Sequence, residues 1–222
     1  TAETIRRDLN VLESSGLLRR VHGGAVTMDR LIFEPGLEER SQQMTDEKAR
    51  IAEAAIRYLP DSGAVFLDAG STTAQLAERI PSSSKLTVAT NSLPIALMLA
   101  HQPNLTVMMT GGRIRGRTQA GVDDWALRSV ESIRVDVAFV AANAVSVEHG
   151  LGTPDPSEAA IKRAIVQSGE SVVLLADHTK FQTKSLLSYA PFSAVGGVVT
   201  GSNLDDDPPG LTESTGVAVV PN

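Results

Sequence analysis

The 222-residue chain contains no cysteine, which excludes disulfide bonds and thiolate chemistry. It contains no apolar run of roughly 18 residues, so no segment is long enough to span a membrane. Histidine is scarce, and His149 and His178 lack the spacing of metal ligands, so we expect both to be loop residues. These absences predict a cytoplasmic protein that uses no metal, no cofactor and no membrane.

Acidic residues outnumber basic ones, and the net charge of −6 argues at first against nucleic acid as a partner. The charge is unevenly distributed along the chain. Residues 1–30 hold five arginines against four acidic side chains, so this segment is slightly basic and the remainder is acidic. An acidic body with a locally basic segment can still bind DNA through that segment.

The first 26 residues are the most distinctive part of the sequence. Ile5, Leu9 and Leu12 recur at the spacing of one helix face. Thr1 is a candidate N-cap for this helix, and Gly16 stands where a helix stop is expected. A short amphipathic helix is therefore predicted at the start of the chain.

A small basic hairpin is predicted after this helix, with a strand over 17–21, a turn over 22–24 and a return strand from Ala25. Helix and hairpin together suit the major groove and flanking phosphates of DNA. The candidate DNA contacts are Thr4, Arg6, Arg7, Asn10, Arg19, Arg20 and His22. The alternative is a basic helix face that is only solvated, followed by an ordinary hairpin.

From residue 46 onward, short apolar strands alternate with helices. Strands are predicted at 64–67, 86–90, 105–110, 135–142, 171–176 and 195–200. Helices are predicted to begin near residues 45, 71, 91, 123 and 155, where Ser, Thr, Asn or Asp stands at each candidate start. This alternation predicts an α/β fold, with a mostly parallel sheet covered by helices on both faces.

Composition divides the chain into four segments. We expect a DNA-binding fragment over 1–28, a linker over 29–45, a main domain over 46–201 and a polar tail over 202–222. The linker is polar, contains Pro35-Gly36 and has no sustained period. The tail is rich in Pro, Gly and acids, and its GVAVV stretch is a candidate edge strand.

Polar side chains follow several of the predicted strands, at the edge where ligands bind in open parallel sheets. These strand ends carry Asp68, Gly70, Ser71, Thr72 and Thr73, then Thr90, Asn91 and Ser92, then Gly112, and finally Asp177 and Lys180. Hydroxyls and backbone N–H groups at such turns can converge on a phosphate. Simple helix capping is the alternative, although capping needs one hydroxyl and residues 71–73 supply three.

Two lysines are candidates to balance the charge of a phosphate or to hold a sugar hydroxyl. Lys162 lies four residues after Glu158, so an ordinary surface ion pair within one helix explains it equally well. Lys180 follows a strand end, and ligand contact is favoured for it. Arg113, Arg115 and Arg117 alternate after two glycines, which favours a solvated loop over a basic flap above an anion.

The amino-terminal segment ETIRRDLNVLESSGLLRRVHGGA closely resembles the second half of the winged helix-turn-helix of the DeoR family of bacterial transcriptional repressors. A complete domain of that family has two further helices upstream. The resemblance implies that the sequence begins at or just before the recognition helix. A fragment without those helices is expected to bind DNA poorly.

The main domain resembles the effector-sensing domain of the same family over roughly residues 46–200. The resemblance is carried by FLDAGSTTAQLA, TVATNSLPIA, MTGGRIR, EHGLGTPDPSEAAIKRA and LLADHTKF, in this order. It implies a fold like those of sugar-phosphate isomerases and coenzyme A transferases, and a phosphosugar as effector. Residues 141–144, Ala-Ala-Asn-Ala, depart from the glycines usual in the family, so the choice of effector is expected to differ.

By residue match, the resemblance implies a phosphate site at Gly70, Ser71, Thr72 and Thr73, with Thr90, Asn91 and Ser92 nearby. The rest of the effector site would be lined by Asp68, Gly112, Glu158, Lys162, Asp177 and Lys180.

Two functions are weighed against each other. The first is a repressor of carbohydrate metabolism that binds operator DNA, responds to a phosphorylated sugar and assembles as a dimer or tetramer. The second is a phosphosugar isomerase, in which Asp68, Glu158, Asp177 and Lys180 would supply acid–base groups. The basic amino-terminal segment favours the regulator, because an isomerase does not need it.

Overall fold

The structure is a computed structural model that describes residues 2–14, 18–21, 24–27, 31–201 and 217–220. Four sequence predictions fall outside these residues: the N-cap at Thr1, the helix stop at Gly16, the turn at residues 22–23 and most of the polar tail. None of the described helices combines the length and apolar character needed to cross a lipid bilayer.

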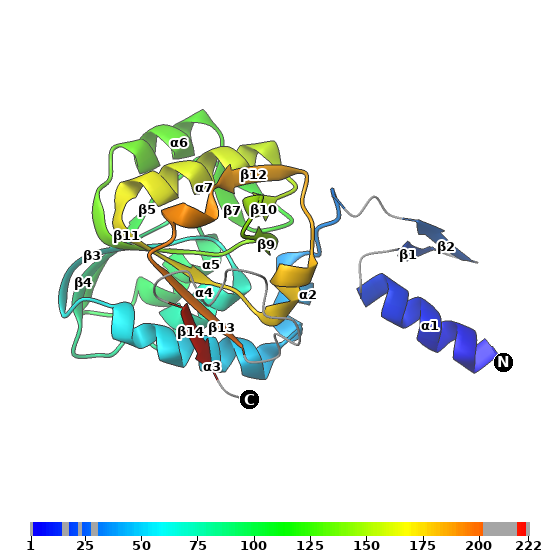
Figure 1. The fold of residues 1–222 in the computed structure, drawn as a ribbon. Helices are drawn as coiled ribbons and strands as arrows, with labels where there is room; N and C mark the ends of the chain where they lie inside the picture. The colour runs from blue at the N-terminus through cyan, green and yellow to red at the C-terminus, as the bar shows by residue number, and fades with distance from the viewer. Residues whose placement is uncertain (1, 15–17, 22–23, 28–30, 202–216, 221–222) are drawn as a thin grey trace.

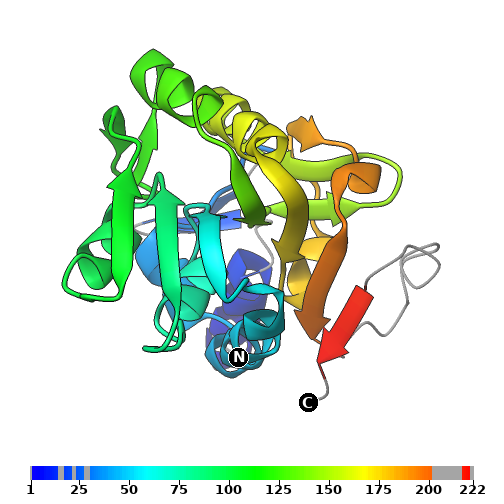
Figure 2. The ribbon, with the colours of Figure 1, turned by 90° about the vertical axis from the view of Figure 1, so that its left-hand side faces the viewer.

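Within the described residues, seven parallel strands form the central sheet in the spatial order β14-β13-β11-β8-β3-β4-β5. Their bounds are Ser62–Leu67 (β3), Lys85–Thr90 (β4), Leu105–Met109 (β5), Val135–Val140 (β8), Gly169–Leu175 (β11), Gly197–Gly201 (β13) and Val217–Val220 (β14). Figure 2 shows the strands side by side, with the red β14 at one edge. The predicted parallel sheet and the GVAVV edge strand are therefore confirmed.

Helices cover both faces of this sheet (Figure 1). One layer contains α3 (Thr45–Ala55), α4 (Ser71–Ala77) and α5 (Leu93–Leu99), and the other contains α6 (Asp124–Glu131) and α7 (Pro156–Ser168). Alternation along a strand assigns its side chains to the two layers. Val65 and Leu67 pack with the first layer, whereas Phe66 packs with the second.

The helix starts follow the predicted capping chemistry, with two exceptions. Asp155 accepts a hydrogen bond from the Glu158 N–H, Asp123 accepts from Trp125 N–H, and Ser92 accepts from Ile95 N–H. Thr45 is the first residue of α3 and not its cap, and Gly70 precedes α4 without any side-chain cap. The 3-10 helix η1 (Ile56–Tyr58) follows directly after α3.

Two smaller sheets and two short 3-10 helices lie beside the main sheet and were not predicted. The antiparallel strands are β9 (Ala144–Ser146), β10 (Gly150–Thr153) and β12 (Leu187–Ala190) in one sheet, and β6 (Arg113–Arg115) and β7 (Ala120–Val122) in the other. The 3-10 helices are η2 (His178–Gln182) and η3 (Phe192–Ala194). At three or four residues each, these five strands showed no alternation from which they were predicted.

The amino-terminal segment forms the predicted helix and hairpin. These are α1 (Ala2–Ser14) and the antiparallel strands β1 (Leu18–Val21) and β2 (Gly24–Thr27). Helix α1 packs against β1. A short helix, α2 (Leu37–Gln42), forms within the stretch predicted to be a linker.

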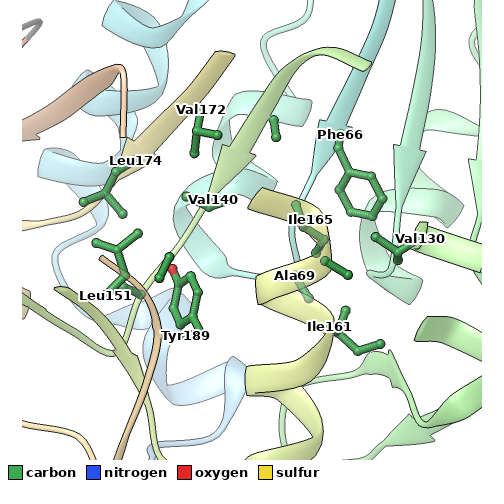
Figure 3. Packing of buried hydrophobic residues seen from close by; sticks show 14 of the residues in the cluster. Phe66, Ala69, Val130, Val140, Leu151, Ile161, Ile165, Val172, Leu174 and Tyr189 are labelled. Carbon is green, nitrogen blue, oxygen red and sulfur yellow. The ribbon is translucent and has the colours of Figure 1, made fainter. Parts of the chain in front are cut away.

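The core between the sheet and α7 determines much of the stability. Figure 3 shows Phe66, Ile161 and Ile165 among the buried side chains of this cluster. Phe66 has no solvent exposure. Its ring therefore contributes its full transfer free energy to folding.

We expect Phe66→Ala to lower the free energy of unfolding by about 3–5 kcal/mol, because it removes a fully buried ring and leaves a cavity. Urea denaturation followed by circular dichroism measures this change. Trp125→Ala is the control, since Trp125 is 73% exposed and its loss should cost less than about 0.5 kcal/mol. Equal losses for the two variants would contradict the assigned core.

Candidate functional site

The strand order reverses at β3. After β3 the chain adds β4 and β5 on one side, and then crosses to β8, β11, β13 and β14 on the other side. The carboxyl ends of β3 and β8 therefore lie next to each other while their connections diverge. In open α/β sheets this switch point is where ligands bind.

A buried ion pair occupies the switch point. Asp68 follows β3 and has no solvent exposure, and Lys162 on α7 is 4% exposed. The Lys162 Nζ lies 2.5 Å from Asp68 Oδ2, which also accepts a hydrogen bond from the Ala141 N–H at 3.1 Å. Lys162 and the Tyr189 hydroxyl both donate to the Ala141 carbonyl at 3.0 Å. This network joins β3, α7, β12 and the end of β8.

The second oxygen of the Asp68 carboxylate takes no part in this network. Asp68 Oδ1 is buried and has no hydrogen-bond partner among the described residues. Burial raises the pKa of the Asp68 carboxyl, and the Lys162 ammonium and the Ala141 N–H oppose that rise. An unpartnered buried oxygen is unfavourable by itself, so it is a natural acceptor for a ligand hydroxyl.

Lys162 does not form the ordinary surface pair with Glu158 that the spacing also allowed. Both residues are buried, and each has a different partner. Glu158 Oε1 accepts a hydrogen bond from the Thr118 hydroxyl and lies 3.2 Å from Arg115 Nη1. The two side chains are one helical turn apart and serve two adjoining clusters.

The segment 70–73 leads from β3 into α4. A Cβ on Gly70 would lie 2.8 Å from the Ala141 Cβ, so this close approach requires glycine. Thr73 donates its hydroxyl to the Asp68 carbonyl at 2.6 Å and is therefore committed to the turn. Ser71 and Thr72 are buried, and their hydroxyls form no hydrogen bond with any described residue. Two of the three predicted hydroxyls thus remain available, and neither caps α4.

The segment 90–92 supports this turn from the neighbouring strand. Thr90 donates to the Leu67 carbonyl at 2.6 Å, and Asn91 Oδ1 accepts from the Ala69 N–H at 2.9 Å. Ser92 caps α5. In the structure these side chains position residues 67–70, and the bonds account for all three without a ligand.

Gly112 has a structural requirement of its own. Its φ is +89°, and a Cβ there would lie 2.7 Å from the Val122 carbonyl oxygen and 2.8 Å from the Ala126 Cβ. Glycine is therefore needed for the hairpin β6–β7 to pack against α6. The three atoms nearest to such a Cβ belong to Val122, Ala126 and Asp123 and not to the Asp68–Lys162 pair.

The sequence favoured a solvated loop for Arg115. In the structure Arg115 instead lies at the centre of an acidic cluster. Its guanidinium contacts Glu34 at 2.6 Å, Asp155 at 3.0 Å and Glu158 at 3.2 Å. Three carboxylates around one guanidinium raise its pKa, against the effect of burial. The cluster joins the hairpin β6–β7 to α7 and to the segment before α2.

The sequence contains no pattern that singles out Glu34, which is 3% exposed and lies in the predicted linker. It also did not point to Thr118 or Tyr189, and it pointed to Asn143 only through the departure at residues 141–144. The partners of all three are far away in the chain. A pocket of about 320 Å³ opens beside Glu34 and Arg115. It is lined by Ile32, Phe33, Glu34, Arg115, Arg117, Pro154 and Asp155.

Asp177 and Lys180 form a second polar group at the end of β11. Asp177 caps η2 through the Thr179 N–H, and its Oδ2 lies 3.7 Å from Lys180 Nζ. The structure gives neither residue a hydrogen bond or ion pair to the Asp68–Lys162 pair. Beside them, the Glu47 carboxylate accepts from the His178 N–H at 2.9 Å.

Lys48 lies next to this second group and is 3% exposed. It donates to the carbonyls of Arg40 and Gln43. Burial lowers the pKa of Lys48 from 10.5 to about 8, and Asp177 opposes that effect. The sequence did not single out this lysine.

The predicted DNA contacts are distributed over α1 and the hairpin. Thr4, Arg7 and Asn10 stand at successive turns of α1 and are exposed. Arg6 lies on the same helix, and Arg19 and Arg20 lie on β1, but their side chains are outside the described set. His22 lies outside the described residues altogether.

The fold is an α/β domain with a polar site at its switch point, preceded in the sequence by a helix and a hairpin. Residues 43–202 match the family model described as the DeoR C-terminal sensor domain, and residues 1–30 match the DeoR-like helix-turn-helix domain. The chain therefore belongs to the DeoR family of HTH-type transcriptional regulators, a family of DNA-binding repressors.

Named relatives cover nearly the whole chain. The HTH-type transcriptional regulator GlpR of Haloferax volcanii is 37% identical over 98% of this chain and 85% of its own length. The regulator IolR of Bacillus subtilis is 34% identical over 92% of this chain and 81% of its own length. The repressor CsqR of Escherichia coli is 29% identical over 96% of this chain and 80% of its own length. All three relatives are named as transcriptional regulators or repressors.

Solved structures resemble the chain in fold only. The eIF2B beta subunit of Chaetomium thermophilum aligns with a TM-score of 0.50 and 17% identity, over 73% of this chain and 53% of that one. Ribose 5-phosphate isomerase A of Neisseria gonorrhoeae aligns with a TM-score of 0.45 and 19% identity, over 61% of this chain and 53% of that one.

The low pKa of Lys48 predicts a pH dependence of stability. An unfolded lysine keeps its proton up to about pH 10.4, so between pH 8 and that value the unfolded state binds more protons. The free energy of unfolding therefore rises with pH through this window. Relative to Lys48→Met, the wild type should gain about 2–3 kcal/mol between pH 7.5 and 10.5. A difference that stays constant in urea denaturation across this range would contradict the assignment.

Proposed function

We propose that this chain represses genes of carbohydrate metabolism in the cytoplasm and that a phosphorylated sugar controls its binding to operator DNA. The observation that carries this proposal is the buried Oδ1 of Asp68 at the switch point, which has no hydrogen-bond partner among the described residues. Ser71 and Thr72 follow it by three and four positions, and their hydroxyls form no hydrogen bond within the described part of the chain either. A carboxylate oxygen accepts a sugar hydroxyl, and small hydroxyls donate to phosphate oxygens.

In this proposal, Ser71 and Thr72 bind the phosphate, assisted by the Gly70 turn, while Asp68 and Lys162 bind the sugar. Glu158 shapes the site through Arg115. Thr73, Thr90, Asn91, Ser92 and Gly112 hold the surrounding turns in place. Asp177 and Lys180 form the more distant wall.

The same contacts favour binding over catalysis. Glu158 is neutralised by Arg115 and bonded to Thr118, and Asp68 is paired with Lys162. A general acid or base must instead be free to exchange a proton with the substrate. Incubation with pentose and hexose phosphates, followed by NMR, tests the isomerase alternative, and any turnover would support it.

An effector controls DNA binding only if it binds one conformational state better than the other. The linker region between α1 and the sensor domain must therefore differ between the two states. We also expect a dimer or tetramer, because helix-turn-helix proteins commonly bind paired half-sites.

We expect Thr72→Val to weaken binding of the cognate sugar phosphate about 10- to 100-fold, since it removes a hydrogen bond to a charged group. Isothermal titration calorimetry over a series of pentose and hexose phosphates measures this. Thr106→Val, on the exposed edge strand β5, makes the same chemical change away from the site. If no sugar phosphate binds the wild type or alters its occupancy of DNA, the proposed effector is wrong.

Arg7→Ala should weaken binding to operator DNA about 10-fold or more, because Arg7 is an exposed cation on α1. Fluorescence anisotropy at fixed salt, on protein with the complete winged helix-turn-helix, gives the dissociation constants. Lys85→Ala removes an exposed cation at the amino end of β4 and should leave binding unchanged. Equal DNA affinity of Arg7→Ala and wild type would contradict the proposal that α1 contacts the operator DNA.

A further inference from the structure

Glu34 inserts from the segment before α2 into the sensor domain. Its Oε2 lies 2.6 Å from Arg115 Nη1, and its Oε1 accepts a hydrogen bond from the Asn143 side chain at 3.4 Å. The Glu34 backbone carbonyl accepts a further bond from the Arg117 guanidinium. Glu34, which lies in the expected linker, is thus held by donors on β6, on the loop between β6 and β7, and on the loop after β8.

Residues on both sides of Glu34 are also hydrogen-bonded to the main domain. The Leu31 carbonyl accepts from the Leu186 N–H at 2.9 Å, and the Leu37 N–H donates to the Arg117 carbonyl at 2.8 Å. Thr27, the last residue of β2, precedes Glu34 by seven positions. Only a short length of chain therefore connects residues 31–37 to the amino-terminal hairpin.

The Glu34 contacts are continuous with the proposed effector site. Arg115 contacts both Glu34 and Glu158, and Glu158 lies one turn of α7 before Lys162. On the other side, Asn143 follows Ala141 by two residues, and the Ala141 carbonyl accepts from Lys162. Asp68 has no solvent exposure, so a ligand reaches it only by displacing groups that cover it.

Glu34 is the member of this continuous network whose contacts a ligand can replace chemically. The pocket of about 320 Å³ gives access to Arg115 beside it. A guanidinium binds the oxygens of ligands as readily as those of a carboxylate side chain. If Glu34 leaves, Arg115 keeps its contacts with Asp155 and Glu158 and is not left as an unpaired buried charge.

We propose that Glu34 is a built-in competitor of the effector. Its carboxylate holds residues 31–37 on the sensor domain, and oxygen atoms of a bound effector take over its donors on Arg115 and Asn143 and release that segment. This inference rests on the proposed function, and it names how occupancy of that site reaches the DNA-reading segment.

The test compares Glu34→Gln with Glu38→Gln, which removes a charge from the same segment at an exposed position of α2. Titration calorimetry uses the sugar phosphate that binds the wild type, and amide hydrogen exchange follows Leu37. Glu34→Gln should bind that sugar phosphate about 5- to 50-fold more tightly, because linkage between competing groups is reciprocal. Its Leu37 amide should exchange as fast as that of the effector-bound wild type, and Glu38→Gln should match the wild type.

An Arg115→Met background separates competition from altered folding. Without the shared partner, Glu34→Gln should no longer tighten effector binding, and a double-mutant cycle measures this loss. Equal effector affinity of Glu34→Gln and wild type, with Leu37 still protected when the effector is bound, would overturn the inference alone. Failure of every sugar phosphate to bind the wild type would instead overturn the proposed function.

Discussion

The buried ion pair of Asp68 and Lys162 is the constraint on which the site depends. It joins the end of β3 to α7 and, through Ala141, to the end of β8. Burying two charges costs much of their solvation, and the cost is offset only when geometry and hydrogen bonds are good. Here Asp68 Oδ2 and Lys162 are well bonded, whereas Asp68 Oδ1 is not. The fold thus retains an unsatisfied acceptor at its switch point, which is an expected feature of a binding site and not of an optimised core.

The regulator needs only modest coupling between its two segments. Allosteric coupling is typically about 1–3 kcal/mol, which a few hydrogen bonds or one charged contact can supply. Residues 31–37 provide contacts of this kind, with Glu34 on Arg115 and Leu37 on Arg117. In the sequence they stand between the amino-terminal hairpin and the sheet of the main domain, so in the proposed mechanism their contacts are what an effector changes.

The sequence predicted what depends on local patterns. The strands, the parallel sheet and the cap at Asp155 follow from alternation, apolar runs and capping residues, and the structure confirms them. It could not predict which charges pair. Lys162 pairs with Asp68 across 94 positions, although spacing pointed equally to Glu158, and Arg115 pairs with Glu34 across 81. Such pairs are set by the strand order, which periodicity does not contain. The same limit explains why the hydroxyls of Thr73 and Thr90 could not be told apart from those of Ser71 and Thr72 before their backbone partners were known.

The most direct measurement is a crystal structure of the protein with a sugar phosphate that changes its DNA occupancy. We expect phosphate oxygens at hydrogen-bond distance from the Ser71 and Thr72 hydroxyls, and a sugar hydroxyl on Asp68 Oδ1. We also expect that the Glu34–Arg115 contact of 2.6 Å is broken in that complex. A phosphate bound away from the switch point, with Asp68 still buried and untouched, would contradict the account.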